Sequence, residues 1–263
     1  MIHEAKPGVP KYESIAFDEK RSQYCLLIPV LNEHTRIEKE LWRAKGHGID
    51  RVCDIIVCDG ASTDGCAEPE TLRALGVNAL LILRGPGRQG AQLRMGFSFA
   101  LARGYAGFVT IDGNNKDSIE DVPRFLEKLA GGYDFIQGSR FVRGGKAVNT
   151  PPGRYLAVRL IHAPIISHTA GQRFTDTTNA YRAYSRRYLE HPDVQPLRDV
   201  FVSYELLAYL SVRASQLGMR ACEIPVTRAY PKRGKAPTKI RSLRGHAELI
   251  HILFENMQGR YRP

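Results

Sequence analysis

Short apolar runs alternate with segments whose apolar residues recur at helical spacing through the first half of the chain. The apolar runs predict strands at Tyr24–Val30, Cys53–Cys58, Ala79–Leu83, Phe108–Ile111 and Phe135–Gln137. The segments between them predict helices at Glu33–Lys45, Glu70–Leu75, Gln92–Arg103 and Ile119–Ala130. This alternation predicts right-handed crossovers and an α/β fold with a mostly parallel sheet that helices cover on both faces.

The pattern becomes less regular after Gly138. Further helices are expected at Tyr155–Ser167, Ser203–Leu217 and Leu243–Met257, and a further strand at Arg220–Val226. We expect an N-terminal arm (1–22), one main domain (23–240) and a C-terminal helix (241–263). Within the main domain, a nucleotide-binding half (about 23–138) would precede an acceptor half (about 139–240).

The charge balance points to an anionic partner, because 38 Lys and Arg residues face 27 Asp and Glu residues. Nucleic acid, an anionic membrane surface and a phosphorylated substrate all fit a net charge of +11. Zinc-finger, RNP-like and basic-zipper patterns do not occur in the sequence, so we expect no nucleic-acid partner. The five cysteines form no C-x-x-C pair, which favours buried thiols in a reducing, cytosolic compartment.

Membrane segments are not evident in the sequence. The stretch from Met1 to Gln23 has no apolar core of signal-peptide length, and no run of about 18 apolar residues occurs. The expected helix at Tyr155–Ser167 mixes a broad apolar surface with basic residues, which suits either packing on the sheet or partial insertion at a membrane interface. We expect a cytoplasmic protein, peripheral at the inner face of the membrane.

The strand that ends at Ile111 runs directly into oxygen-bearing side chains. Asp112, Gly113 and Asn114 follow it, and in open α/β sheets ligands bind beyond the carboxyl ends of strands. Oxygen ligands two residues apart suit Mg²⁺ or Mn²⁺, which bind through one or two carboxylates and substrate phosphates. A plain polar turn would use the same residue types, so both interpretations stay open.

Three other expected strand ends carry similar chemistry. Asn32 and Glu33 follow the first strand, where they could cap the next helix and complement its dipole. Asp59 ends the second strand and could accept hydrogen bonds from a base or a ribose, or shape a turn. The glycine-rich loop around Arg88 could approach a phosphate, although its spacing matches neither a Walker loop nor a dinucleotide fingerprint.

Taken in order, these motifs resemble glycosyltransferase family 2, whose members have the GT-A fold and use nucleotide-sugar donors. The likeness rests on IPVLNE (28–33), CDGASTDG (58–65), GRQGAQ (87–92), IDGNNKDS (111–118), QGSRF (137–141) and TDTTNAYRAYSR (175–186). The later motifs, together with the segment around Arg154 and the basic loop ending at Ile240, look most like dolichol-phosphate mannosyltransferases and bacterial polyprenol-phosphate glycosyltransferases.

The resemblance implies roles for individual residues. The nucleotide-sugar site would comprise Pro29, Asn32, Glu33, Asp59, Arg88, Asp112, Gly113, Asn114, Arg233 and Lys239. Asp112 and Asn114 would bind the metal, and the acceptor site would comprise Arg140, Arg154, Asn179 and Arg182. Asp112, Arg140, Arg154 and Asp176 would be the catalytic residues.

Three departures from the family pattern concern the charges of this site. A single Asp59 stands where paired acids are usual, Asn114 replaces the second acid of the metal motif, and Lys116 occupies a position where relatives often have another ligand. An amide is a weaker metal ligand than a carboxylate, so metal dependence is open. Lys116 could itself neutralise phosphate charge.

The expected reaction is metal-assisted, inverting transfer of a sugar from a nucleotide-diphosphate donor to a polyprenyl phosphate. A phosphate acceptor is already ionised and needs positioning more than a base, whereas a saccharide hydroxyl would need Asp176 or Glu205 as base. Transfer to a saccharide hydroxyl in surface-polysaccharide synthesis and a degenerate nucleotide-binding protein are the alternatives. A membrane-anchoring partner or a homo-oligomer is compatible with either enzyme. The basic stretch from Arg228 to Arg244 is either a solvated charge run or a mobile lid over the diphosphate.

Overall fold

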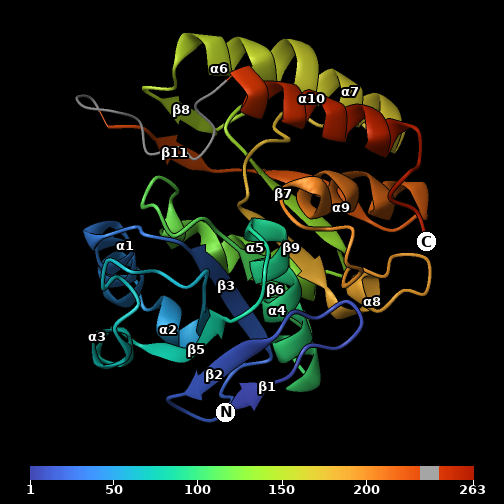
Figure 1. Ribbon diagram of the computed structural model, residues 1–263. Helices are drawn as coiled ribbons and strands as arrows, with labels where there is room; N and C mark the ends of the chain where they lie inside the picture. The colour runs from blue at the N-terminus through green and yellow to red at the C-terminus, as the bar shows by residue number, and fades with distance from the viewer. Residues whose placement is uncertain (232–242) are drawn as a thin grey trace.

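The computed structural model describes residues 1–231 and 243–263 and is built around one large mixed sheet (Figure 1). Its strand order is β1-β2-β5-β4-β3-β6-β9-β7-β10. The strands are β1 (Ile2–His3), β2 (Tyr12–Ala16), β3 (Tyr24–Val30), β4 (Asp54–Asp59), β5 (Val77–Leu83), β6 (Gly107–Thr110), β7 (Phe135–Ser139), β9 (Arg182–Ser185) and β10 (Ala221–Pro225). Strands β5, β4, β3 and β6 run parallel, so the predicted parallel core of an α/β fold is confirmed.

Helices pack on both faces of the sheet, as the alternating pattern predicts. One face carries α1 (Thr35–Gly46), α2 (Ile49–Val52), α3 (Pro69–Ala74) and α5 (Val122–Ala130), the last preceded by the short 3₁₀ helix η1 (Ile119–Asp121). The other face carries α4 (Gln89–Ala102), α7 (Ala163–Ala170), α9 (Glu205–Gln216) and α10 (Leu243–Met257). The elements α6 (Pro152–Ala157) and η2 (Val158–His162) lead directly into α7, and α8 (Arg186–Leu189) follows β9.

Antiparallel strands at two places make the sheet mixed. Strand β2 pairs antiparallel with β5, and β9 lies antiparallel between β6 and β7. Residues of the expected N-terminal arm therefore supply β1 and β2 at one edge of the main sheet. Neither strand was predicted, because both are short and their apolar positions do not form a continuous run.

The strand order places the predicted ligand site at a reversal of the sheet. Strands β4 and β5 lie on one side of β3, whereas β6 lies on the other. Ligands of open α/β sheets bind at such a reversal, beyond the carboxyl ends of the strands. A small parallel sheet of β8 (Lys146–Val148) and β11 (Thr227–Ala229) stands beside it, and a bridge between Asp117 and Arg228 joins β11 to the loop after β6.

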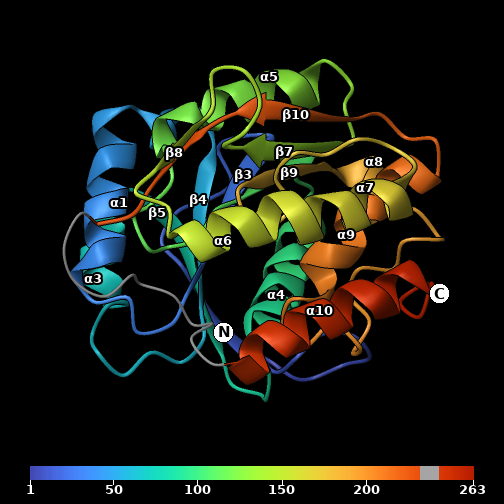
Figure 2. The same cartoon turned by 90° about the horizontal axis from the view of Figure 1, so that it is seen from above.

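The helices α6, α7 and α10 lie on the same side of the molecule (Figures 1 and 2). Helix α10 packs against α7 and α9, and Asn256 donates a hydrogen bond to the carbonyl of Ala208 at 3.0 Å. Among the described residues, no helix has the length and apolar character that crossing a membrane requires. All five cysteines belong to the described chain, and all are free thiols, in agreement with the sequence.

Candidate active site

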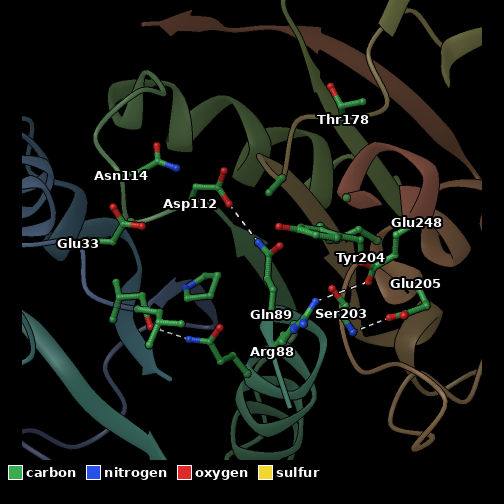
Figure 3. A pocket seen from close by; sticks show the side chains of 18 of the residues that line it. Glu33, Arg88, Gln89, Asp112, Asn114, Thr178, Ser203, Tyr204, Glu205 and Glu248 are labelled. Carbon is green, nitrogen blue, oxygen red and sulfur yellow. Dashed lines mark hydrogen bonds and ion pairs between the residues drawn. The ribbon is translucent and has the colours of Figure 1, made fainter. Parts of the chain in front are cut away.

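A cleft of about 1320 Å³ opens at the carboxyl ends of β3 and β6. Its walls come from these strand ends, the start of α4, the start of α9 and the first turns of α10. Figure 3 shows Asp112 and Asn114 on one side of this space, with Gln89, Arg88, Tyr204 and Glu248 facing it from the other elements. Among the residues predicted for the site, the cleft is lined by Pro29, Glu33, Arg88, Asp112, Gly113, Asn114 and Arg154.

Asp112 is bound by two side chains that the sequence analysis did not assign to the site. Its Oδ1 accepts a hydrogen bond from Gln89 Nε2 at 3.1 Å, and its Oδ2 pairs with Arg228 Nη2 at 2.9 Å. Burial tends to raise the pKa of the carboxyl, but Arg228 and Lys116 outweigh it and lower the pKa below its usual value. Asp112 is therefore held as an anion in the cleft.

Arg228 links three acceptors on two loops. Its guanidinium pairs with Asp117 and with Asp112, and Nη1 donates to Asn179 Oδ1 at 3.2 Å. Burial tends to lower the pKa of Arg228, but the two aspartates raise it above its ordinary value. In the sequence Arg228 was only the first residue of a basic stretch, and its place in β11, beside the loop after β6, depends on a long-range contact.

The residues at the metal motif fit one divalent ion of modest affinity. Asn114 Oδ1 is buried without a hydrogen-bond partner among the described residues, and Asn114 follows Asp112 by two positions. Within residues 1–231 and 243–263 no three His, Cys, Asp or Glu side chains gather as a metal cluster. One carboxylate and one amide oxygen suit Mg²⁺ or Mn²⁺ only if substrate phosphates and water complete the coordination.

Close backbone packing holds the metal motif against the sheet. A Cβ on Gly113 would lie 2.5 Å from Val30 Cγ1, so only glycine fits between Asp112 and Asn114. Gln92, on the buried side of α4, donates to the carbonyls of Val30 at 2.6 Å and Cys58 at 2.8 Å. These bonds tie the ends of β3 and β4 together beneath the cleft. The sequence feature that could identify Gln92 is a polar residue within a mostly apolar helix.

The predicted nucleotide residues after β3 and β4 occupy different places. Glu33 lines the cleft and accepts from Arg36 Nε at 2.8 Å. Asn32 Oδ1 accepts from the backbone N–H of Thr63 at 2.9 Å. Asp59 is buried and accepts from the backbone N–H of Ser62 at 3.0 Å, and burial raises its pKa. Asn32 and Asp59 thus brace the two loops that flank the cleft.

The far side of the cleft is formed by α4 and the C-terminal helix. Arg88, which precedes α4, is exposed, and its Nη1 lies 3.7 Å from Oε1 of Glu248 in α10. A Cβ on Gly90 would meet the Phe201 carbonyl oxygen at 2.5 Å, so α4 begins in tight contact with the segment that leads to α9. Glu205, the first residue of α9, lines the cleft and accepts from the Ser203 N–H at 2.5 Å. It is half-buried at the start of the helix.

Three cationic side chains surround the ring of Tyr230. Arg154 donates to the Tyr230 hydroxyl at 3.0 Å, and Lys116 Nζ lies 5.1 Å from the ring centroid. The Arg228 guanidinium carbon lies 6.0 Å from the same centroid. Burial lowers the pKa of Lys116 to about 8, and Arg228 adds to this effect. All three cations line the cleft, which makes this corner a site of positive charge next to Asp112.

The other predicted acceptor residues are turned into the protein. Arg140 binds Asp176 through two hydrogen bonds, at 2.6 and 2.8 Å, and its side chain is 1% exposed. Arg182 is buried and donates to backbone carbonyls, among them that of Thr177 at 2.9 Å. Asn179 Oδ1 accepts a hydrogen bond from Arg228. The structure brings Arg154 to the cleft, and it places Arg140, Asp176 and Arg182 behind its wall.

Two predicted donor residues, Arg233 and Lys239, lie outside the described residues. The lid hypothesis, which depends on the same stretch, is likewise neither supported nor contradicted. The described part of the chain still contributes α10 to the cleft, through Gly245, Ala247, Glu248 and His251.

The sequence is similar to those of known proteins. Residues 25–191 match the model of glycosyl transferase family 2. The chain is similar to an undecaprenyl-phosphate mannosyltransferase of Micrococcus luteus, with 32% identity over 76% of this chain and 81% of the relative. It is also similar to a polyprenol monophosphomannose synthase of Mycolicibacterium smegmatis, with 26% identity over 77% and 76%.

Solved structures share the fold at lower sequence identity. The glucosyl-3-phosphoglycerate synthase of Mycobacterium tuberculosis, crystallised with Mn²⁺, uridine diphosphate and glucosyl-3-phosphoglycerate, superposes with a TM-score of 0.62 and 18% identity. The match covers 90% of this chain and 79% of that enzyme. These structures show the fold. The match to the family model over most of the chain, with the 32% identity to the Micrococcus luteus enzyme, shows that the protein is a glycosyltransferase and belongs to glycosyl transferase family 2.

Proposed function

We propose that this glycosyltransferase moves a sugar from a nucleotide-diphosphate donor to a polyprenyl phosphate, with inversion at the anomeric carbon. The observation that carries the proposal is the group of Lys116, Arg154 and Arg228 beside Asp112 in one cleft. Both substrates carry phosphate where they react, and such a cluster is suited to holding phosphates close together. The two polyprenyl-phosphate enzymes to which the chain is similar support the same acceptor class.

The donor would bind along the strand ends, with its diphosphate next to Asp112. Asp112 and Asn114 would hold Mg²⁺ or Mn²⁺, which supplies positive charge to the leaving diphosphate. Glu33 and Pro29 would contact the nucleoside, and Arg88 at the start of α4 would approach a phosphate. The Mycobacterium tuberculosis enzyme, which shares the fold, was crystallised with Mn²⁺ and uridine diphosphate, which supports a role for a divalent ion.

The acceptor phosphate would meet Arg154 at the Tyr230 corner of the cleft. A phosphate oxygen is ionised at neutral pH, so positioning for in-line attack takes the place of a general base. The sequence-based prediction that Arg140 also contacts this phosphate stays a prediction, since Arg140 lies behind Thr178 and donates to its Oγ1 at 3.0 Å. Through this contact, Arg140 and Asp176 would position Thr178 at the cleft wall.

One observation favours a second candidate, transfer to a saccharide hydroxyl. Such an acceptor needs a base, and the Glu205 carboxylate lines the cleft. Asp176, the other base considered from the sequence, is occupied by Arg140. The two candidates therefore differ in a residue that can be tested.

Turnover across a donor panel decides between the two acceptors. With Mg²⁺ or Mn²⁺ present, we expect nucleotide release that depends on added short-chain polyprenyl phosphate and that falls at least about 100-fold in Arg154→Ala. Arg159→Ala is the matched control, because Arg159 follows on the same helical stretch and lies over the Phe141 ring at 5.3 Å. Nucleotide release that does not depend on added polyprenyl phosphate but is lost in Glu205→Gln would support the hydroxyl acceptor instead.

We further propose that the α6 to α10 side of the molecule rests on the membrane that holds the acceptor. Large apolar side chains are exposed on η2 and α10, including Leu160 at 69% and Phe254 at 45%. These helices lie on one side of the molecule (Figure 2), and Arg154 at the cleft belongs to the adjoining α6. Apolar residues flanked by basic ones are typical of interfacial helices.

Vesicle binding tests this surface. We expect Leu160→Asp to weaken binding to anionic vesicles about tenfold or more, because one buried leucine contributes about 1.5–3 kcal/mol. Trp42→Asp is the control, since Trp42 is 64% exposed on α1, which packs on the other face of the sheet. Equal losses in the two variants would show that this side is not the contact surface.

A further inference from the structure

Asp112, the carboxylate at the metal motif, is already neutralised within the protein. Arg228 occupies its Oδ2 at 2.9 Å and Gln89 its Oδ1 at 3.1 Å. Lys116 lines the same cleft and adds a second positive charge beside it. A divalent ion that arrives alone therefore meets one paired carboxylate, one amide oxygen and two cations.

Arg228 cannot leave this position without cost. Its other nitrogen pairs with Asp117, whose side chain is 0% exposed, and also donates to Asn179 Oδ1 at 3.2 Å. Moving the guanidinium away would leave a charged carboxylate buried without a partner, which is strongly unfavourable. Asp117 thus fixes the buried side of the guanidinium, and the side that faces the cleft contacts Asp112.

We propose that Arg228 is a built-in counter-ion that keeps the metal motif from binding a divalent ion until a nucleoside diphosphate is present. The diphosphate supplies the negative charge and the oxygen ligands that Asp112 and Asn114 lack. Metal and nucleotide then bind with positive coupling, and by linkage each strengthens the other equally. This inference rests on the proposed function, because it assigns the diphosphate to the cleft.

Metal binding itself, measured without turnover, tests the proposal. Free Mn²⁺ is followed by electron paramagnetic resonance as it is titrated into the full chain, alone and with UDP or GDP. In the wild type we expect either nucleotide to tighten Mn²⁺ binding at least about tenfold. In Arg228→Gln, Mn²⁺ alone should bind about tenfold tighter than in the wild type, and the effect of the nucleotide should shrink.

Two further variants keep the test decisive. Arg36→Gln removes a cation that lines the same cleft and pairs with Glu33 at 2.8 Å, and we expect it to leave the affinity for Mn²⁺ alone unchanged. Arg228→Gln combined with Asp117→Asn keeps the inner charges balanced if the single variant fails to fold. Mn²⁺ binding alone that is no tighter in either folded Arg228 variant would overturn the proposal. Absent turnover with intact coupling would instead count against the proposed function.

Discussion

Two arginine–aspartate contacts in this protein use the same chemistry and face different surroundings. Arg228 meets Asp112 at the wall of the cleft, whereas Arg140 meets Asp176 in the interior, where the two side chains are 1% and 0% exposed. Both aspartates lie within motifs from which we expected ligand binding. Each forms the same kind of ionic contact, and burial decides whether that contact is open to a ligand or holds a loop.

The loops that carry the two aspartates are supported in parallel ways. Glu40 of α1 accepts a hydrogen bond from the Asn115 N–H at 2.8 Å, behind the loop that carries Asp112. Glu223 of β10 accepts hydrogen bonds from the N–H groups of Thr175 at 2.9 Å and Asp176 at 3.0 Å, behind the loop that carries Asp176. Burial raises the pKa of both glutamates. The two regions therefore differ mainly in what lies in front of the aspartate.

The largest expected effect is on stability and concerns the buried pair of Arg140 and Asp176. Asp176→Ala leaves the Arg140 guanidinium buried without its partner, so we expect the free energy of unfolding to fall by about 3–5 kcal/mol. Urea unfolding followed by circular dichroism measures this loss. The double variant Arg140→Met with Asp176→Leu should recover much of it, because an apolar pair carries no uncompensated charge. A loss below about 1 kcal/mol in the single variant would mean that water reaches this pair.

The pair of Arg228 and Asp112 at the cleft should show the opposite behaviour, with a large effect on activity and a small effect on stability. Asp112→Asn keeps the shape of the side chain but removes its charge, and we expect lipid-dependent turnover to fall at least about 100-fold. Arg228 keeps Asp117 as its partner, so the free energy of unfolding should change by less than about 1 kcal/mol. Initial rates and urea unfolding of the same preparation provide both numbers. If Asp112→Asn destabilised the protein as much as Asp176→Ala, the distinction between the two regions would fail.

The sequence was sufficient where the structure depends on local patterns. Continuous apolar runs located β3, β4, β5, β6 and β7, and helical spacing located α1, α4, α5 and α10. Strands β2 and β9 were missed, because both are short and their apolar positions do not form a continuous run. Antiparallel pairing with distant strands sets their places in the sheet.

The site could be predicted only as far as its residues follow strand ends. Asp112, Asn114 and Glu33 were identified because parallel strands bring their carboxyl ends to one edge. Arg228 was not identified, since its contact with Asp112 spans 116 positions and the sequence shows it only as the first of several basic residues in one stretch. Conversely, nothing in the motif around Arg140 indicates that the side chain points inward, because that depends on Asp176 in another loop.

The smallest expected effects concern the two supporting glutamates. Below its usual pKa, Glu40 is protonated in both the folded and the unfolded chain; as the pH rises through the raised folded pKa, wild-type stability is lost. Glu40→Gln should therefore gain stability relative to the wild type between pH 5 and pH 8. One amide oxygen suffices for the Asn115 N–H, and in the described part of the chain Glu40 Oε1 has no hydrogen-bond partner.

Glu223→Gln should behave differently, although burial also raises the pKa of Glu223. Both carboxylate oxygens accept from Thr175, so an amide would place its NH₂ group against a donor. We expect a loss of about 1 kcal/mol at pH 8 that offsets the gain from removing the charge. Parallel urea titrations at pH 5 and pH 8 compare the two variants. If both gained equally, the two loops would be held by equivalent contacts, and the difference between the regions would lie only in Arg140 and Arg228.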